Sequence, residues 1–312
     1  MKRISRLILL VCLFGTASFA QDRGTYSFLR NEVGARAAGL NGSFVSMTND
    51  PNLIFYNPGA LTTLSQPRGS AGFLKQLLDV NGGYISYARS VDGVGTVGGG
   101  ILYLDYGSFN ETDESMNTLG TFGARDLALV IGVGRSLDEA MSVGMNLKLI
   151  YSSIGEYKSS GVAIDAGVLY KIPSQNITIG ASVLTLGTQL RTYDGVKESL
   201  PLDVTIGITK RPEHLPVYLN FDFHHLTDKQ DKALDHLSSF SFGAEFLMSE
   251  SVRLRVGYNN QQRKDLKLGT SPGLAGMSLG GGILIGEYIV DYAFNSYGKI
   301  GGLHRISVGM SL

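Results

Sequence analysis

The feature that most constrains this chain is a two-residue period that runs from about residue 67 to the C-terminus. In residues 251–258, one face carries Val, Leu, Val and Tyr, while the other carries Ser, Arg, Arg and Gly. Such alternation indicates β-strands with one apolar face and one polar or small face. Most of these segments are about ten residues long, the length that a tilted strand needs to cross a bilayer. The pattern predicts fourteen strands, at 68–75, 82–90, 94–105, 124–135, 140–152, 160–171, 176–187, 202–211, 215–224, 239–248, 251–260, 276–286, 288–295 and 303–312.

The connections between these segments alternate between short and long. The short ones lie at 91–93, 136–139, 172–175, 212–214, 249–250 and 287, and the longer ones include 106–123, 188–201, 225–238 and 261–275. Outer-membrane barrels have short periplasmic turns and longer extracellular loops, whereas a soluble β-sandwich has no reason to sort its loops in this way. We therefore predict an all-β fold, in which residues 67–312 form a 14-stranded antiparallel transmembrane β-barrel preceded by an N-terminal hatch segment.

Residues 1–20 have the pattern of a secretory signal peptide. Three basic residues precede an apolar stretch at 7–14 that is too short to span a bilayer, and Ser18 and Ala20 have the spacing of a cleavage site. The alternative is a membrane anchor that is not removed. Cys12 is the only cysteine, so the mature chain is predicted to have none. Together with the barrel pattern, the export signal predicts a location in the bacterial outer membrane.

The charge balance argues against two other classes of protein. The chain has 27 Lys and Arg and 27 Asp and Glu, which gives a formal net charge of zero. Nucleic-acid-binding proteins usually show a basic excess, so no nucleic-acid partner is expected. Disordered chains are rich in charge, and only 17% of these residues are charged.

Residues 21–66 differ from the rest of the chain. They show little alternation and several turn signals, such as Asn41-Gly42, Asn49-Asp50-Pro51 and Asn57-Pro58-Gly59. A structured segment before the first strand could fold into the lumen as a hatch or plug. The alternatives are a periplasmic tail or one or two further strands.

Several motifs in this segment occur together in a known family. They are residues 34–42 (GARAAGLNG), 49–51 (NDP) and 55–61 (FYNPGAL), and they are followed by further matches at 25–29, 106–109, 144–150, 163–167, 186–189 and 200–202. In these residues the chain resembles the PorV/PorQ family of FadL-like outer-membrane barrels, and PorQ-like members more than PorV-like ones. The family hatch usually reads Asn-Pro-Ala, whereas this chain has Asn57-Pro58-Gly59-Ala60.

The resemblance implies a fourteen-stranded barrel with a hatch and a role in type IX protein secretion. PorQ-like members anchor partners of the PorZ and PorU type at the cell surface, and PorV-like members shuttle cargo. It also implies that the hatch motif residues are Gly34, Arg36, Gly39, Asp50, Asn57 and Pro58. The alternative function is that of a FadL-type transporter of hydrophobic small molecules, and a third is a structural barrel with neither role. The polar long loops fit protein contact better than capture of apolar ligands.

Motifs that would indicate an enzyme or a cofactor are weak. Residues 93–98 match G-x-G-x-x-G by letter, but a strand pattern follows instead of the helix that a dinucleotide site needs. The densest set of possible metal ligands is His224, His225, Asp228, Asp231, Asp235 and His236, whose spacing fits no known metal motif. No Gly-x-Ser-x-Gly motif occurs at a strand-to-helix turn. We therefore expect no catalytic activity, no cofactor and no metal; outer-membrane lipid and other secretion proteins are the expected partners.

Arg253 and Arg255 occupy the polar face of their strand, so they are predicted to face the lumen. A charge facing lipid at the bilayer midplane would cost about 2–4 kcal/mol. Acidic residues of the hatch, such as Asp50 or Glu32, are the expected partners of this arginine pair.

Overall fold

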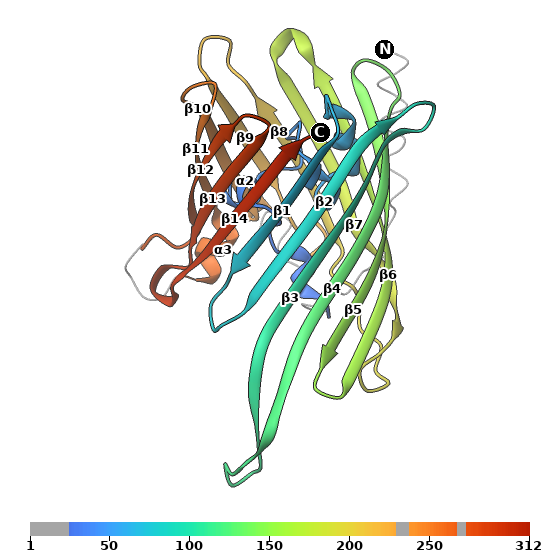
Figure 1. Ribbon diagram of the computed structural model, residues 1–312, viewed down its shortest axis with the longest axis vertical. Coiled ribbons are helices and arrows are strands. Elements are labelled where there is room, and N and C mark those ends of the chain that lie inside the picture. Colours follow the sequence, from blue (N-terminus) through green and yellow to red (C-terminus); the bar gives the residue numbers. More distant parts are fainter. Residues whose placement is uncertain (1–24, 229–236, 267–272) are drawn as a thin grey trace.

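The computed structural model describes residues 25–228, 237–266 and 273–312, so the predicted signal peptide lies outside the described residues. In the described ranges the chain forms fourteen antiparallel strands, and β14 pairs with β1 to close a barrel (Figure 1). The strands are β1 (Arg68–Lys75), β2 (Asn81–Val91), β3 (Gly95–Thr112), β4 (Thr118–Ser136), β5 (Met141–Ile154), β6 (Tyr157–Ile172), β7 (Ile177–Arg191), β8 (Asp203–Lys210), β9 (Val217–Phe223), β10 (Phe240–Leu247), β11 (Val252–Asn259), β12 (Met277–Ile285), β13 (Tyr288–Ser296) and β14 (Gly302–Ser311). The predicted fold class is confirmed.

The barrel is apolar outside and polar inside. Outward side chains such as Ile131 and Ile283 are 63% and 53% exposed, while inward polar ones such as Asn146, Asp222 and Glu245 are almost completely buried. A water-soluble barrel would have the opposite arrangement, and an apolar outer band is what a lipid bilayer requires. Closure leaves no unpaired strand edge, which lipid would not tolerate.

The short turns and the C-terminal end of β14 lie at one end of the barrel, at the top of Figure 1. At the other end, the predicted loop at 106–123 was wrong in part. Strand β3 extends to Thr112 and β4 already begins at Thr118, so the two strands form a hairpin that projects beyond the other strands. Likewise β7 continues to Arg191, into the predicted loop at 188–201. Both faces of a strand meet water beyond the bilayer, so polar residues occupy both faces and the alternation that marks a membrane strand is lost.

Residues 27–63 lie inside the barrel as short helices joined by turns. These are η1 (Ser27–Arg30), α2 (Ala35–Gly39), η2 (Pro51–Phe55) and η3 (Pro58–Thr63). The helices η4 (Pro173–Gln175), α3 (Asn260–Asp265) and η6 (Gly298–Ile300) lie in connections between strands. The described part of the segment contains no strand, so the alternative of additional strands is wrong for residues 25–66. None of the helices in the described ranges is long and apolar enough to cross a membrane.

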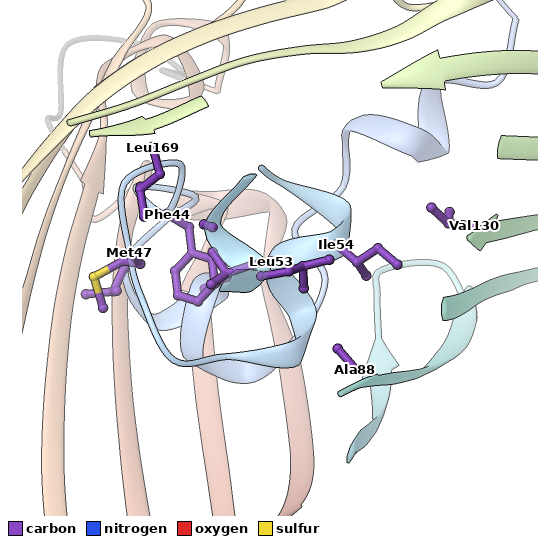
Figure 2. Close-up of a cluster of buried hydrophobic side chains, with 11 residues drawn as sticks. Phe44, Met47, Leu53, Ile54, Ala88, Val130 and Leu169 are labelled. Atoms are coloured by element: carbon purple, nitrogen blue, oxygen red, sulfur yellow. The ribbon is translucent and has the colours of Figure 1, made fainter. Parts of the chain in front are cut away.

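The apolar core of the molecule lies between this N-terminal segment and the barrel wall. Phe44, Leu53 and Ile54 of the segment pack in one cluster with Val130 of β4 and Leu169 of β6 (Figure 2). Full burial of one such side chain stabilises a protein by about 1.5–3 kcal/mol. The segment is therefore held in the lumen by burial of its own apolar side chains as well as by polar contacts.

Candidate functional site

Glycines on the inner wall allow the backbone of the N-terminal segment to pack directly against the backbone of the strands. Asn57 and Pro58 begin η3 and pack against Gly144 of β5 and Gly167 of β6. A Cβ at Gly167 would lie 2.8 Å from Pro58 Cδ, and one at Gly134 would lie 2.7 Å from the Pro58 carbonyl oxygen. No larger residue fits at these positions without moving the backbone. The glycines at these three positions are thus explained by the close approach of the N-terminal segment.

Asn57 fixes this contact with its side-chain amide. Its Oδ1 accepts a hydrogen bond from the Gly59 amide at 3.1 Å and caps η3. Its Nδ2 donates to the Val45 carbonyl at 2.8 Å and to the Val168 carbonyl of β6 at 2.9 Å. One side chain therefore joins two turns of the segment to the wall, and Pro58 at the first helical position fits because it needs no amide donor there.

Arg36 lies at the centre of a buried ion-pair network on the opposite side of the lumen. Its Nε and Nη2 donate to the two carboxylate oxygens of Glu245 on β10, at 2.9 and 2.8 Å, and its Nη1 donates to Asp50 at 3.3 Å. Glu245 also accepts from Arg255 of β11 at 2.7 Å, and Arg255 donates to Asp291 of β13 at 2.6 Å. The network joins the N-terminal segment to three strands.

The predicted inward direction of Arg255 is confirmed, but the expected partners were wrong. Arg255 pairs with carboxylates of the wall, because Glu245 is its direct cross-strand neighbour. Asp50 pairs instead with Arg36, and Glu32 pairs with Arg305 of β14 at 2.8 Å.

The remaining two motif residues, Gly34 and Gly39, lie where a side chain would collide with neighbouring atoms. Gly34 has φ +88° at the start of α2, and a Cβ there would lie 2.7 Å from Asn52 Nδ2. Gly39 lies against Gly280 of β12, and a Cβ on Gly39 would lie 3.3 Å from the Gly280 Cα. The Gly39 carbonyl accepts a hydrogen bond from the Ser278 hydroxyl at 3.0 Å. Arg36, Gly39 and Asp50 thus lie towards β10–β13, and Asn57 and Pro58 lie against β4–β6. Gly34 lies against Asn52 and Tyr84 of β2, so the six predicted residues do not form a single site.

Sequence reasoning missed the wall residues that hold the segment. Besides Glu245, Asp222 of β9 accepts hydrogen bonds from the Phe44 and Val45 amides at 2.7 and 2.9 Å. Both acids occupy inward positions of short strands. An ionised residue on the inner face of a membrane barrel needs a partner in the lumen, and this was the available signal.

At the long-loop end, Arg30 of η1 forms a bidentate pair with Asp228, at 2.8 and 2.7 Å. Nearby, His224 Nε2 lies 2.6 Å from Ser241 Oγ, and His225 Nδ1 lies 3.1 Å from Asp203 Oδ1. Burial lowers the pKa of His224 to about 4. Burial would also lower the pKa of His225, but the Asp203 charge outweighs it and raises that pKa above its ordinary value.

The glycine motif at 93–98 does not open a helix, and the possible metal ligands lie partly outside the described residues. Within the described ranges, no group of three or more His, Cys, Asp or Glu side chains is placed to hold a metal; Asp231, Asp235 and His236 lie outside these ranges. The glycine motif at 93–98 runs from a tight turn into strand β3.

Two cavities lie along the N-terminal segment. The first, the lumenal cavity, has a volume of about 110 Å³ and is bordered by residues 29–33 of the segment and by wall residues that include Leu102, Lys148 and Asp203. The second, the mouth pocket, has a volume of about 600 Å³ and lies at the long-loop end, bordered by residues 25–27 of the segment and by aromatic side chains of β3, β4 and the 192–202 loop. Residues 25–27 thus border the mouth pocket, and residues 29–33 border the lumenal cavity.

Solved structures of similar fold include two toluene transporters and a FadL homologue. The toluene transporter TbuX of Ralstonia pickettii aligns with a TM-score of 0.63 at 10% identity, over 90% of this chain and 98% of that chain. The toluene transporter TodX of Pseudomonas putida aligns with a TM-score of 0.57 at 14% identity, over 95% and 99%. A FadL homologue of Pseudomonas aeruginosa aligns with a TM-score of 0.58 at 9% identity, over 90% and 98%. No family model and no curated relative matches the chain.

At these identities the likeness shows the fold alone. The chain has the FadL-type fold, and its closed fourteen-stranded barrel with an apolar outer face is that of a bacterial outer-membrane protein. The resemblance to the PorV/PorQ family receives no support from these comparisons.

Proposed function

We propose that this protein is a FadL-type channel that carries small hydrophobic molecules across the outer membrane. From the sequence, this function is the alternative to a role in type IX secretion. The observation that carries it is the pair of cavities, because one short stretch, residues 25–33, borders both an aromatic-lined pocket at the long-loop end and a cavity in the lumen. Two solved structures of the same fold are described as toluene transporters.

The lumen is closed in this conformation. A dry protein cavity that holds benzene has a volume of roughly 150 Å³, and the lumenal cavity has about 110 Å³. Passage therefore requires displacement of the N-terminal segment. We propose that residues 21–66 act as a hatch and that Gly34, Arg36, Gly39, Asp50, Asn57 and Pro58 form its seat.

Uptake by intact cells tests this function. Gram-negative cells that lack their own FadL-type channel are compared with and without this protein in the outer membrane, and the entry of radiolabelled toluene and of glycerol is followed. We expect toluene entry to rise several-fold and glycerol entry to stay unchanged. Equal toluene entry in both strains would contradict the function, and a parallel rise in glycerol would indicate a leaky pore.

A second candidate function, scaffolding of type IX secretion partners, is favoured by the projecting β3–β4 hairpin. Its tip exposes Met116 (87%) and Leu119 (65%), beside acidic residues at 111, 113 and 114. Exposed apolar side chains of this kind are typical of protein-contact surfaces.

Extraction from the native outer membrane in mild detergent separates the two functions. Recovery of a PorZ-like or PorU-like protein in near-equal amount, lost in the Met116→Ser/Leu119→Ser variant, would support the scaffold. Recovery of sorting-domain cargo would indicate a shuttle. A barrel recovered alone with an apolar ligand would support the channel.

A further inference from the structure

The mouth pocket combines aromatic walls with a buried acid. Its lining includes Tyr26 of the segment, Tyr106 and Phe109 of β3, Phe122 of β4 and Tyr193 of the 192–202 loop. Asp126 of β4 also borders the pocket and is only 8% exposed. The pocket is therefore amphipathic, with aromatic rings close to a buried acid.

Asp126 has no cationic partner among the described residues. The Tyr106 hydroxyl donates to its Oδ2 at 2.6 Å. The neighbouring Arg125 also borders the pocket, but its Nε pairs with Asp105 at 3.3 Å and not with Asp126. The second acid of the pocket, Glu198, has no ion pair in the described ranges either. A buried carboxylate without a counter-charge is costly, and a bound cation would remove that cost.

Aromatic rings favour the same kind of ligand. A cation over the face of a tyrosine or phenylalanine ring is stabilised by the ring quadrupole, and aromatic cages that bind organic ammonium groups use this effect. An apolar body attached to the ammonium group would fill the rest of a 600 Å³ pocket.

We infer that the mouth pocket binds organic amines with an apolar body, with the ammonium group at Asp126. This inference deepens the proposed channel function, because it names a class of molecule that enters at the mouth. Its role in uptake rests on that function, whereas binding itself does not and is measured without transport.

The test is isothermal titration calorimetry on the full mature protein in detergent, with four ligands of similar size. These are 2-phenylethylamine, 2-phenylethanol, propylbenzene and phenylacetate. We expect the amine to bind at least tenfold more tightly than the alcohol and the hydrocarbon, and the anion to bind most weakly, because it would meet two unpaired acids.

Variants locate the ligand. Asp126→Asn keeps an acceptor for the Tyr106 hydroxyl but removes the charge, and it should lower amine affinity tenfold or more while leaving the alcohol within about twofold. Tyr193→Leu should weaken the amine through loss of a ring. Asp194→Asn is the matched control, since it removes one exposed acid from the same loop outside the pocket, and it should change nothing.

Two results would overturn the inference. One is equal affinity for the amine and the alcohol in the unmodified protein. The other is unchanged amine affinity in Asp126→Asn, with folding of the variant verified by the heat-dependent mobility of the barrel on gels. If the amine binds as expected but toluene does not enter cells, the channel function fails and the binding site stands.

Discussion

Loss of the Arg36 charge should release the N-terminal segment from the wall. In Arg36→Met, the apolar stem remains, but three hydrogen bonds to Glu245 and Asp50 are lost, at 2.8, 2.9 and 3.3 Å. Removal of one partner from a buried ion pair costs about 3–5 kcal/mol. Glu245 keeps its bond to Arg255, so the lower end of this range, about 3 kcal/mol, applies. That energy corresponds to roughly a hundredfold larger population of undocked segment.

A second arginine of the same segment provides the matched control. Arg30 also forms a bidentate pair, with Asp228, but these side chains are 20% and 26% exposed, whereas Arg36 and Glu245 are 10% and 0% exposed. Solvent screens a partly exposed pair of this kind, so its loss is expected to cost about 1 kcal/mol, the upper end of the range for solvent-exposed pairs. Arg30→Met should therefore change the undocked population by no more than about fivefold.

Amide hydrogen exchange measures this difference directly. The amides of Ala38, Leu40 and Asn41 donate within the segment, and those of Phe44 and Val45 donate to Asp222. We expect all five amides to exchange roughly a hundredfold faster in Arg36→Met than in the unmodified protein. In Arg30→Met their exchange rates should be nearly unchanged. Unchanged exchange in Arg36→Met, or equal acceleration in both variants, would refute the assignment of Arg36 as the main anchor.

Two further predictions concern other parts of the lumen. Gly144→Ala should displace η3 and accelerate exchange of its amides, because the new Cβ would collide with the Pro58 backbone; Gly99→Ala, where the nearest atom is 3.7 Å away, should fold and exchange as the unmodified protein does. In an NMR titration, His224 should titrate near pH 4 and His225 above the ordinary value of about 6.5. The His224 site therefore loses stability as pH falls below about 6.5 towards 4. The His225–Asp203 pair stabilises the protein fully below about pH 6.5. This stabilisation is lost as the pH rises through the raised pKa of His225. A single shared midpoint would contradict both assignments.

The barrel could be predicted from the sequence because the alternation within each membrane strand shows which side chains face lipid and which face the lumen. The predicted first strand, 68–75, coincides with β1, and the predicted last one, 303–312, differs from β14 by one residue at each end. The alternation arises from lipid on one side and a polar lumen on the other, so it is a local signal. Where β3 and β4 leave the membrane, the signal ends although the backbone pairing continues.

The path of the N-terminal segment could not be predicted in the same way. Its turns were visible, since Asp50-Pro51 and Asn57-Pro58 each place a capping residue before proline, and both caps are formed. Its position depends on contacts with residues far along the chain, such as that of Asn295 with the Ala38 carbonyl at 3.0 Å. No local pattern pairs Arg36 with Glu245, because several inward acids are available and only the closed barrel brings one of them to 2.8 Å.

Locking the N-terminal segment in place tests the central claim, that small hydrophobic molecules pass only when this hatch moves. Ala38 of α2 and Ala293 of β13 lie in one buried cluster, and the only natural cysteine, Cys12, falls in the predicted signal peptide. Ala38→Cys/Ala293→Cys is compared, oxidised and reduced, with the two single variants in the toluene-entry assay. The account predicts that entry is lost in the oxidised double variant alone and returns on reduction. Undiminished entry with the disulfide verified as formed would contradict the account.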